Sequence, residues 1–168
     1  MKKVIIISAY PKWVHKILQG YKKAYVCKVK PTCELPITVY VYCTKRGHFE
    51  IGVDDVIRYL PGNNLKGKVV AKFTLNKVEE INLETDWNEE YERLTAMTRE
   101  EALVYADQHE TIAIWHIDNP VILVEPLLLN EAFYNVPTKK QLKENPHGVI
   151  VQSIMKAPQT YTYALTKE

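Results

Sequence analysis

A four-residue apolar run near the start of the chain constrains the fold most strongly. The segment Val4–Ile7 contains only β-branched residues, which is the pattern of a strand buried on both faces. The run is shorter than the apolar segment of a signal peptide, which needs about seven residues, and far shorter than a membrane span of about 20. We therefore predict that Val4–Ile7 is a central strand of a sheet.

Helical and extended patterns follow this strand without the regular alternation of a doubly wound fold. A helix is predicted from Pro11, which suits a first helical turn, to Gln19, because Gly20 supplies a stop. Thr98 and Glu101 form a capping box that opens another helix, and Asn119-Pro120 predicts a strand break. Strands are expected within 22–30, 37–44, 67–81, 111–117, 121–124, 149–154 and 160–165, helices at 11–19, 89–94 and 98–106, an amphipathic piece at 54–59, an apolar segment packed on the core at 127–133 and a surface loop at 134–148.

These elements predict an α+β fold in a single domain over residues 1–168. Six or seven short strands mixed with two or three helices fit a small, mixed, partly closed β-barrel with the helices packed at its side. The length of 168 residues is typical of one domain with one sizeable core.

Charge is distributed unevenly along the chain. Residues 1–77 hold 15 basic and 4 acidic side chains, residues 79–110 hold 2 basic and 11 acidic, and residues 111–168 hold 5 of each. The net charge of +2 excludes nonspecific binding of nucleic acid by bulk charge. The small net charge is still compatible with a basic side of the molecule that carries a cleft and an acidic helical segment elsewhere. The acidic segment is a solvated face, a source of carboxylates or a docking surface.

Cysteine and histidine usage argues against a disulfide scaffold, a metal site and a cofactor. The three cysteines, Cys27, Cys33 and Cys43, match neither a disulfide framework nor a zinc motif, and they predict a cytoplasmic protein. The five histidines lack metal-ligand spacing, and phosphate-cradling glycine loops are missing. Cys27 and Cys43 lie in apolar strands, where burial makes a thiol unreactive.

A stretch of alternating cations and aromatic rings is the first candidate site. Lys22, Lys23 and Lys28 share one extended segment with Tyr25, and such mixtures bind nucleic-acid strands through phosphates and stacked bases. The alternative is that Lys22 is a solvated lysine after the helix cap at Gly20.

Two further candidates lie at strand positions. Thr44, Lys45 and Arg46 form a basic tip that either grips a phosphate or blunts a sheet edge. Trp115 and His116 lie inside a strand, where a lone histidine is more often a hydrogen-bonded, partly buried side chain than a catalytic base.

An ordered set of segments resembles the ASCH domains of the PUA-like superfamily. The segments are Ser8–Pro11, Trp13, Ile17, Gly20-Tyr21-Lys22, Val39–Lys45, Leu65–Phe73, Ala113–Ile117 and Ala157–Thr160. The set is similar to the ASCH-like proteins of low-GC Gram-positive bacteria and their phages.

The resemblance implies a PUA-like barrel with a cleft between the sheet and the first helix, and a role in binding RNA or a nucleotide that carries a modified base in some relatives. It places Lys22, the lysine of the Gly-x-Lys signature, at that cleft. Some small ASCH proteins resemble amidohydrolases that deacetylate N4-acetylcytidine with this lysine, a threonine three residues later and a glutamate. Here Tyr25 stands at the threonine position, and a tyrosine does not readily replace a threonine nucleophile.

The preferred hypothesis is an RNA- or nucleotide-binding module with no membrane partner. Its predicted ligand-binding residues are Lys22, Lys23, Tyr25, Lys28, Thr44, Lys45, Arg46, Trp115, His116 and Gln159. The alternative is a hydrolase on a modified nucleoside or a ribonuclease, in which Lys22 works with a carboxylate from the segment Glu79–Glu101. A third hypothesis is an interaction protein whose acidic segment docks a basic partner.

Overall fold

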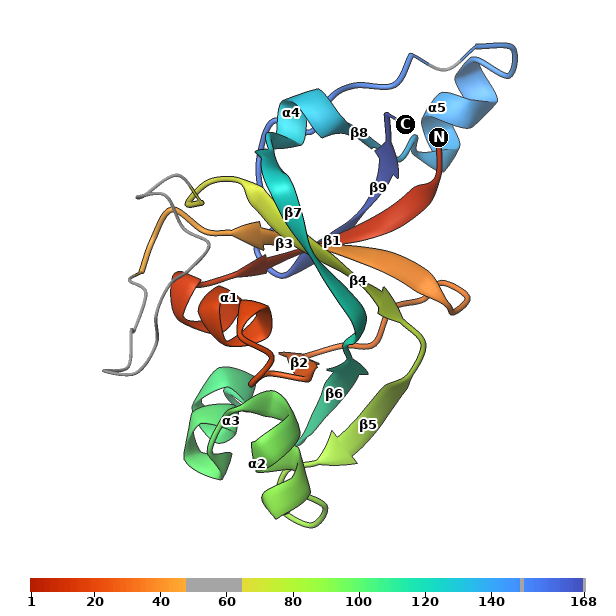
Figure 1. The fold of residues 1–168 in the computed structure, drawn as a ribbon. Coiled ribbons are helices and arrows are strands. Elements are labelled where there is room, and N and C mark those ends of the chain that lie inside the picture. The colour runs from red at the N-terminus through yellow and green to blue at the C-terminus, as the bar shows by residue number, and fades with distance from the viewer. Residues whose placement is uncertain (48–64, 149, 168) are drawn as a thin grey trace.

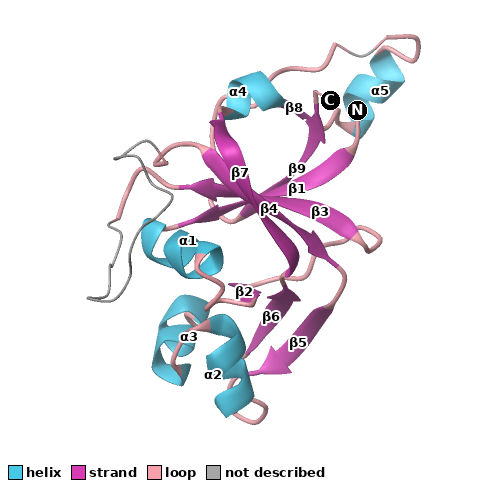
Figure 2. Ribbon diagram, in the orientation of Figure 1, coloured by secondary structure: helices cyan, strands magenta, loops and turns pink. Residues whose placement is uncertain are grey.

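The protein has an α+β architecture built on two β-sheets (Figures 1 and 2). The structure is a computed structural model that describes residues 1–47, 65–148 and 150–167. The larger sheet has the strand order β7-β4-β3-β1-β9-β8, and the smaller has the order β2-β6-β5. The strands are β1 (Lys3–Ala9), β2 (Ala24–Cys27), β3 (Ile37–Cys43), β4 (Val69–Leu75), β5 (Val78–Asn82), β6 (Thr111–His116), β7 (Asp118–Leu127), β8 (Phe133–Asn135) and β9 (Tyr161–Thr166), and the helices are α1 (Pro11–Leu18), α2 (Glu89–Thr95), α3 (Arg99–Ala106), α4 (Leu129–Ala132) and α5 (Lys139–Glu144).

The predicted central strand is confirmed as β1. It pairs in parallel with β3 and antiparallel with β9, inside the six-stranded sheet. Its side chains alternate between two apolar clusters: Ile5 and Ile7 pack in the cluster between the sheets, and Val4 and Ile6 pack on the opposite face of the large sheet. Both faces are buried, as an uninterrupted β-branched run requires.

Helix α1 closes one side of the cluster between the sheets. Pro11 occupies its first turn, and Val14 and Ile17 bury its apolar face. The helix stops at Gly20, whose φ of +78° favours glycine because an L side chain is strained there. Trp115 of β6, fully buried, fills the same cluster from the small sheet.

The predicted strand over 67–81 is wrong in one respect, because it is two strands in different sheets. β4 belongs to the large sheet and β5 to the small one, and the chain changes sheets at 76–77. The reverse change, from β6 to β7, occurs at Ile117 beside it. The Asn76 Nδ2 atom donates to the Asp118 Oδ2 atom at 2.8 Å, which ties the two crossings together. β4 is mostly buried, whereas β5 holds two glutamates and buries only Ile81, and the sequence prediction of one continuous strand did not separate them.

Helices α2 and α3 cover the small sheet. The Thr98–Glu101 capping box is confirmed at the start of α3, and the Asn88 side chain caps α2. Both helices pack on a second apolar cluster that includes Val26, Ile114 and Met97. The acidic segment is therefore a helical layer on one end of the molecule (Figure 1).

The C-terminal third departs most from the sequence predictions. Asn119-Pro120 does not break β7, because β7 is an edge strand and tolerates a proline. The predicted loop at 134–148 contains α5, which opens with a second capping box formed by Thr138 and Gln141. The predicted strand at 149–154 is, in its described part, a single bridge between Ser153 and Tyr134. The predicted amphipathic piece at 54–59 lies outside the described residues.

The barrel stays open. Within the described residues, no ladder of strand pairing connects the large sheet to the small one, and the two sheets are held together by the cluster that includes Trp115. No helix in the described part of the chain has the length and apolar character needed to cross a membrane.

Truncation of Trp115 tests whether the apolar cluster that contains it holds the two sheets together. Trp115→Ala leaves a large cavity between the sheets, and we expect it to lower the free energy of unfolding by about 3–5 kcal/mol, measured by urea denaturation. Trp87→Ala is the matched control, because Trp87 is only partly buried at the edge of the second cluster, and its loss should cost clearly less. Equal losses in the two variants would contradict the assignment of Trp115 as the residue that joins the sheets.

Candidate functional site

The turn after α1 directs one lysine inward and the next outward. The Lys22 backbone N–H donates to the Lys16 carbonyl at 3.0 Å, and the Lys23 backbone N–H donates to the Leu94 carbonyl at 2.7 Å. These bonds fix the chain between α1 and α2. As a result the Lys22 side chain is buried and the Lys23 side chain is exposed.

The Lys22 amine lies in an unusual environment for a lysine. The residue is 3% exposed, and its Nζ atom donates to the Thr95 carbonyl at 2.5 Å. That carbonyl lies at the end of α2, where Ala96 turns the chain into a left-handed conformation and the last helical carbonyls lack helical partners. The Nζ atom also lies 4.7 Å from the centre of the Trp13 ring.

Burial lowers the pKa of Lys22 to about 7, assisted by the positive charge of Lys16 and opposed by the negative charge of Glu101. Near neutral pH a substantial fraction of this amine is therefore uncharged. A strongly perturbed group in a cleft is a candidate for function. The carboxylate of Glu101 pairs with Lys12 at 3.6 Å, and among the described residues the Thr95 carbonyl is the hydrogen-bond partner of the Lys22 amine.

Lys22 opens onto a cleft of about 1080 Å³ between the two sheets. One wall comes from α1, β2 and the α2–α3 region and includes Lys22, Val26, Met97 and Tyr105. The other comes from the ends of β1 and β3 and from the segment before β9. The full lining is Ser8, Ala9, Tyr10, Trp13, Lys22, Tyr25, Val26, Lys28, Tyr42, Thr44, Lys45, Arg46, Met97, Tyr105, Met155, Lys156, Ala157, Pro158, Gln159 and Thr160.

The charge of this lining has one sign. It holds five basic side chains, of which Lys22 is partly uncharged near neutral pH, and none of the described residues that line it is an aspartate or a glutamate. It also holds five aromatic rings. A cleft of this composition attracts an anion that carries flat, stackable groups.

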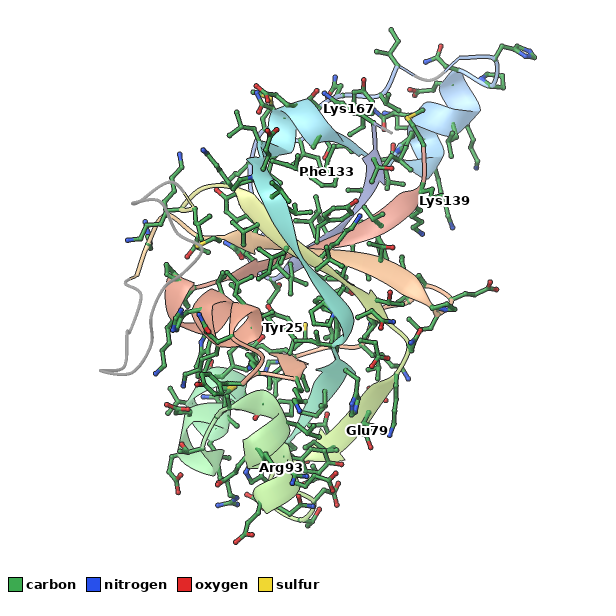
Figure 3. All side chains as sticks on the ribbon, in the orientation of Figure 1. Tyr25, Glu79, Arg93, Phe133, Lys139 and Lys167 are labelled. Carbon is green, nitrogen blue, oxygen red and sulfur yellow. The ribbon has the colours of Figure 1, made fainter. Side chains whose placement is uncertain are left out.

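Tyr25 crosses the cleft between its two walls. Its hydroxyl donates to the Ser8 carbonyl at 3.2 Å, and its ring meets Trp115 edge to face with centroids 6.1 Å apart. Burial raises the pKa of Tyr25 well above its ordinary value, so the hydroxyl stays protonated. Figure 3 shows Tyr25 beside α1, between the sheets.

The basic tip after β3 is held against the start of α1. The Thr44 backbone N–H donates to the Ala9 carbonyl at 3.0 Å, and its hydroxyl donates to the Arg46 carbonyl at 2.8 Å. Gly47 lies so close to Pro11 that an added Cβ atom would be 3.2 Å from the proline ring. Lys45 and Arg46 remain exposed at the cleft.

The segment before β9 completes the second wall. The Ser8 hydroxyl donates to the Pro158 carbonyl at 2.6 Å, and the Ser8 backbone N–H donates to the Thr160 carbonyl at 2.9 Å. These bonds anchor Gln159, which is exposed at the cleft.

The structure brings seven of the ten predicted site residues to this cleft: Lys22, Tyr25, Lys28, Thr44, Lys45, Arg46 and Gln159. Lys23, Trp115 and His116 do not line it. The Lys23 side chain points away from the cleft, because successive residues of the turn direct their side chains to opposite sides. Trp115 is core, and its indole N–H donates to the Val29 carbonyl at 3.3 Å.

His116 belongs to a different surface. Its Nε2 atom lies 2.5 Å from the Glu79 carboxylate on β5, and this hydrogen bond lowers the pKa of Glu79. Glu79 is well separated from Tyr25 in Figure 3. Since Trp115 and His116 are neighbours on one strand, their side chains point to opposite faces and cannot both enter one cleft.

Sequence reasoning did not assign Tyr10, Trp13, Tyr105 and Lys156 to the site, although all four line the cleft. Trp13 follows the helix pattern of a core residue, and Tyr105 lies on an acidic helix with nothing in its spacing to mark it. No group of three histidine, cysteine or acidic side chains that could hold a metal occurs in the described part of the chain.

The sequence matches no protein-family model and no curated protein. Solved structures do match. The crystal structure of ASCH from Zymomonas mobilis superposes with a TM-score of 0.57 at 17% sequence identity, over 97% of this chain and 87% of its own. A tyrosine-to-phenylalanine variant of that protein gives a TM-score of 0.58 at 17% identity, over 99% of this chain and 92% of its own.

This chain has the ASCH fold. The likeness spans nearly the full length of both proteins and confirms the fold that the sequence resemblance implied. In this structure the cleft is lined by Trp13 of the first helix and by Lys22.

The buried Lys22 amine predicts a particular dependence of stability on pH. Its pKa is about 7 in the folded protein against 10.5 for an ordinary lysine, so between these values the unfolded chain binds more protons and stability rises with pH. The penalty for burying the charge is fully present below pH 7. We therefore expect Lys22→Met to be most stabilised relative to wild type at pH 6, and the difference to narrow by pH 9, measured by urea unfolding.

Lys23→Met is the matched control for this experiment. It removes a neighbouring lysine that is exposed, and its pH dependence should follow that of the wild type. A difference between Lys22→Met and wild type that stays constant from pH 6 to pH 9 would show that the buried amine does not titrate in this range.

Proposed function

We propose that this chain binds single-stranded RNA or a nucleotide in the cleft beside α1. The observation that carries the proposal is the lining of the cleft, in which five basic side chains and five aromatic rings occur without a described carboxylate. Sequence-specific RNA recognition uses unpaired bases stacked on aromatic rings, with cations on the backbone. The ASCH fold supports the same proposal by analogy, because the resemblance implies this role.

The roles of the lining residues follow from their exposure. Lys45 and Arg46 are exposed at the tip and are placed to bind phosphates. Tyr10, 57% exposed, offers a ring face at the cleft for a base, whereas the ring of Tyr25 is packed against Trp115. The exposed amide of Gln159 can read a base edge through both donor and acceptor.

The cleft is large enough for more than a single small molecule. Pockets for drug-sized ligands measure about 300–1,000 Å³, and this cleft measures about 1080 Å³. We place the function in the cytoplasm, because the three cysteines are free, as is usual in a reducing compartment.

The salt dependence of binding tests the phosphate contacts. Each phosphate contact on a single strand contributes about −0.7 to the slope of log K against log salt. Lys45→Ala combined with Arg46→Ala should therefore weaken binding of a single-stranded RNA hexamer and make the slope shallower by about 1.4, measured by fluorescence anisotropy from 50 to 300 mM salt.

Lys139→Ala combined with Lys140→Ala is the control. The same two charges are removed from α5, and Figure 3 shows Lys139 far from α1, so the slope should match that of the wild type. If both double variants change the slope equally, binding is a property of overall charge and not of the cleft.

One observation favours a second function, hydrolysis of a modified nucleoside or of RNA. The Lys22 amine has a pKa of about 7, which suits a general base or nucleophile at neutral pH. Among the described residues no carboxylate forms an ion pair with it: Glu101 pairs with Lys12, and Glu79 pairs with His116.

A pH–rate profile tests this second function. With N4-acetylcytidine or an RNA oligomer as substrate, turnover by Lys22 should rise as pH passes through about 7, because the neutral amine is the reactive form. Lys22→Gln should abolish turnover, whereas Lys23→Gln should retain it. Turnover that is undetectable, or that survives in Lys22→Gln, leaves binding as the function of the cleft.

A further inference from the structure

A second hollow, the outer pocket, lies on the large sheet and measures about 440 Å³. Its described lining shares no residue with that of the cleft. Thr38 and Tyr40 line it from β3, and Lys72 and Thr74 line it from β4. Thr38 is aligned with Thr74, and Tyr40 is aligned with Lys72. Because residues two apart on a strand point to one face of the sheet, the four side chains form two cross-strand pairs on that face.

The neighbouring strands extend this face. Val4 of β1, with Lys2 just before it, and Asn119 and Val121 of β7 also line the outer pocket. The two residues of each pair are again two apart in the sequence. Thr166 of β9 completes the lining, and its backbone N–H donates to the Lys2 carbonyl at 3.0 Å. Five strands of the large sheet therefore contribute to this one hollow.

The outer pocket and the cleft lie at opposite ends of the parallel pair β1 and β3. The outer pocket takes Val4 and Thr38 from near the starts of these strands, whereas the cleft takes Ala9 from the end of β1 and Thr44 from just after β3. Val4 also packs in the apolar cluster on the outer face of the large sheet, under α4 and β8. The outer pocket lies beside this cover.

The polar groups of the outer pocket suit a negatively charged ligand. Its lining holds two lysines, three threonines and one asparagine, and none of its described residues is an aspartate or a glutamate. Within the described part of the chain, no hydrogen bond or ion pair uses the side chain of Lys2, Thr38 or Thr74. The Asp118 carboxylate, which is aligned with Thr74 at the sheet edge, lies outside the lining and accepts from Asn76.

These donors favour a small phosphate-bearing molecule over a nucleic-acid strand. Lysine ammonium and threonine hydroxyl groups are common donors to phosphate oxygens. A strand also needs exposed ring faces for its bases. Here Phe73 is buried between the sheets, and the Tyr40 ring contacts Phe133 and has the Lys72 ammonium 5.9 Å from its centre. The volume of about 440 Å³ falls within the range of about 300–1,000 Å³ for small-ligand sites.

We propose that the outer pocket binds a small phosphate-bearing anion, such as a phosphorylated metabolite, independently of the cleft. β1 and β4 flank β3, so Lys2 and Lys72 approach the phosphate from the two sides of Thr38. The hydroxyls of Thr38 and Thr74 donate to its oxygens. Val121, which is 47% exposed, contacts the organic part of the ligand.

Inorganic pyrophosphate is the probe, titrated at constant ionic strength into the isotope-labelled protein and followed by NMR spectroscopy. Amide signals of residues 37–40 and 71–75 report the outer pocket and those of 44–46 report the cleft, so each site gives its own affinity. We expect Lys72→Met to weaken binding at the outer pocket about tenfold, through the loss of a charge-assisted hydrogen bond. Lys2→Met should weaken it about threefold, because an exposed charge contributes less. The same spectra show whether each variant is folded.

Lys3→Met is the matched control. Lys3 is an exposed neighbour of Lys2 in the sequence, but it is outside the lining, and its ammonium lies 4.4 Å from the centre of the Tyr163 ring. The variant removes the same charge and should keep the wild-type affinity at the outer pocket. The inference is overturned if pyrophosphate gives no saturable shift at 37–40 and 71–75, or if Lys3→Met weakens binding there as much as Lys2→Met does. Either result leaves RNA binding in the cleft standing.

Discussion

The burial of one lysine amine connects the parts of this structure on which the cleft depends. Lys22 leaves α1 through a turn, passes beneath the Trp13 ring and donates to the carbonyl of Thr95 at the end of α2. The next residue, Lys23, donates its backbone N–H to Leu94. These two adjacent bonds attach the acidic helical layer to the basic first helix, so the wall of the cleft is a junction between the two oppositely charged segments of the chain.

The same junction separates two kinds of positive charge. Lys45 and Arg46 are exposed and keep ordinary solvation, whereas the Lys22 amine has lost its water and much of its affinity for protons. The exposed pair, Lys45 and Arg46, attracts an anion from a distance. A group that reaches Lys22 meets an amine that both donates and accepts hydrogen bonds, depending on its protonation. The two walls of the cleft therefore differ near neutral pH: one holds the exposed cations Lys45 and Arg46, and the other holds the partly uncharged amine of Lys22.

The sequence predicted well wherever a local pattern determines the result. The β-branched run of Val4–Ile7 requires burial on both faces, and the Thr98 capping box marks a helix start by hydrogen bonds that are local in sequence. The second capping box, at Thr138 and Gln141, carries the same signal, but the prolines, glycine and lysines around it predict a loop. The change of sheet at 76–77 was not predicted, and the hydrogen bond that joins the two crossings links Asn76 to Asp118, 42 residues away in the sequence.

The same distinction between local patterns and long-range contacts explains which site residues were predicted. The Gly-x-Lys turn and the basic tip are each defined by residues that are close in sequence, and both line the cleft. Trp115 and His116 were assigned to the site by residue type, and neither lines it. Strand alternation sends one into the core and the other to Glu79. The spacing of Tyr105 on an acidic helix does not mark it as a cleft residue, and only three-dimensional packing places it there.

The pairing of the first and last strands of the chain, β1 and β9, bears on how the fold depends on chain order. Lys3 of β1 is aligned with Leu165 of β9, and the Thr166 backbone N–H donates to the Lys2 carbonyl at 3.0 Å, so the two ends lie together at the end of the sheet opposite Ser8 and the cleft. A short peptide linking them would close almost no additional loop. A circularly permuted chain with new ends at α5, an exposed helix in Figure 1, would keep every strand pairing of the large sheet and leave the cleft untouched.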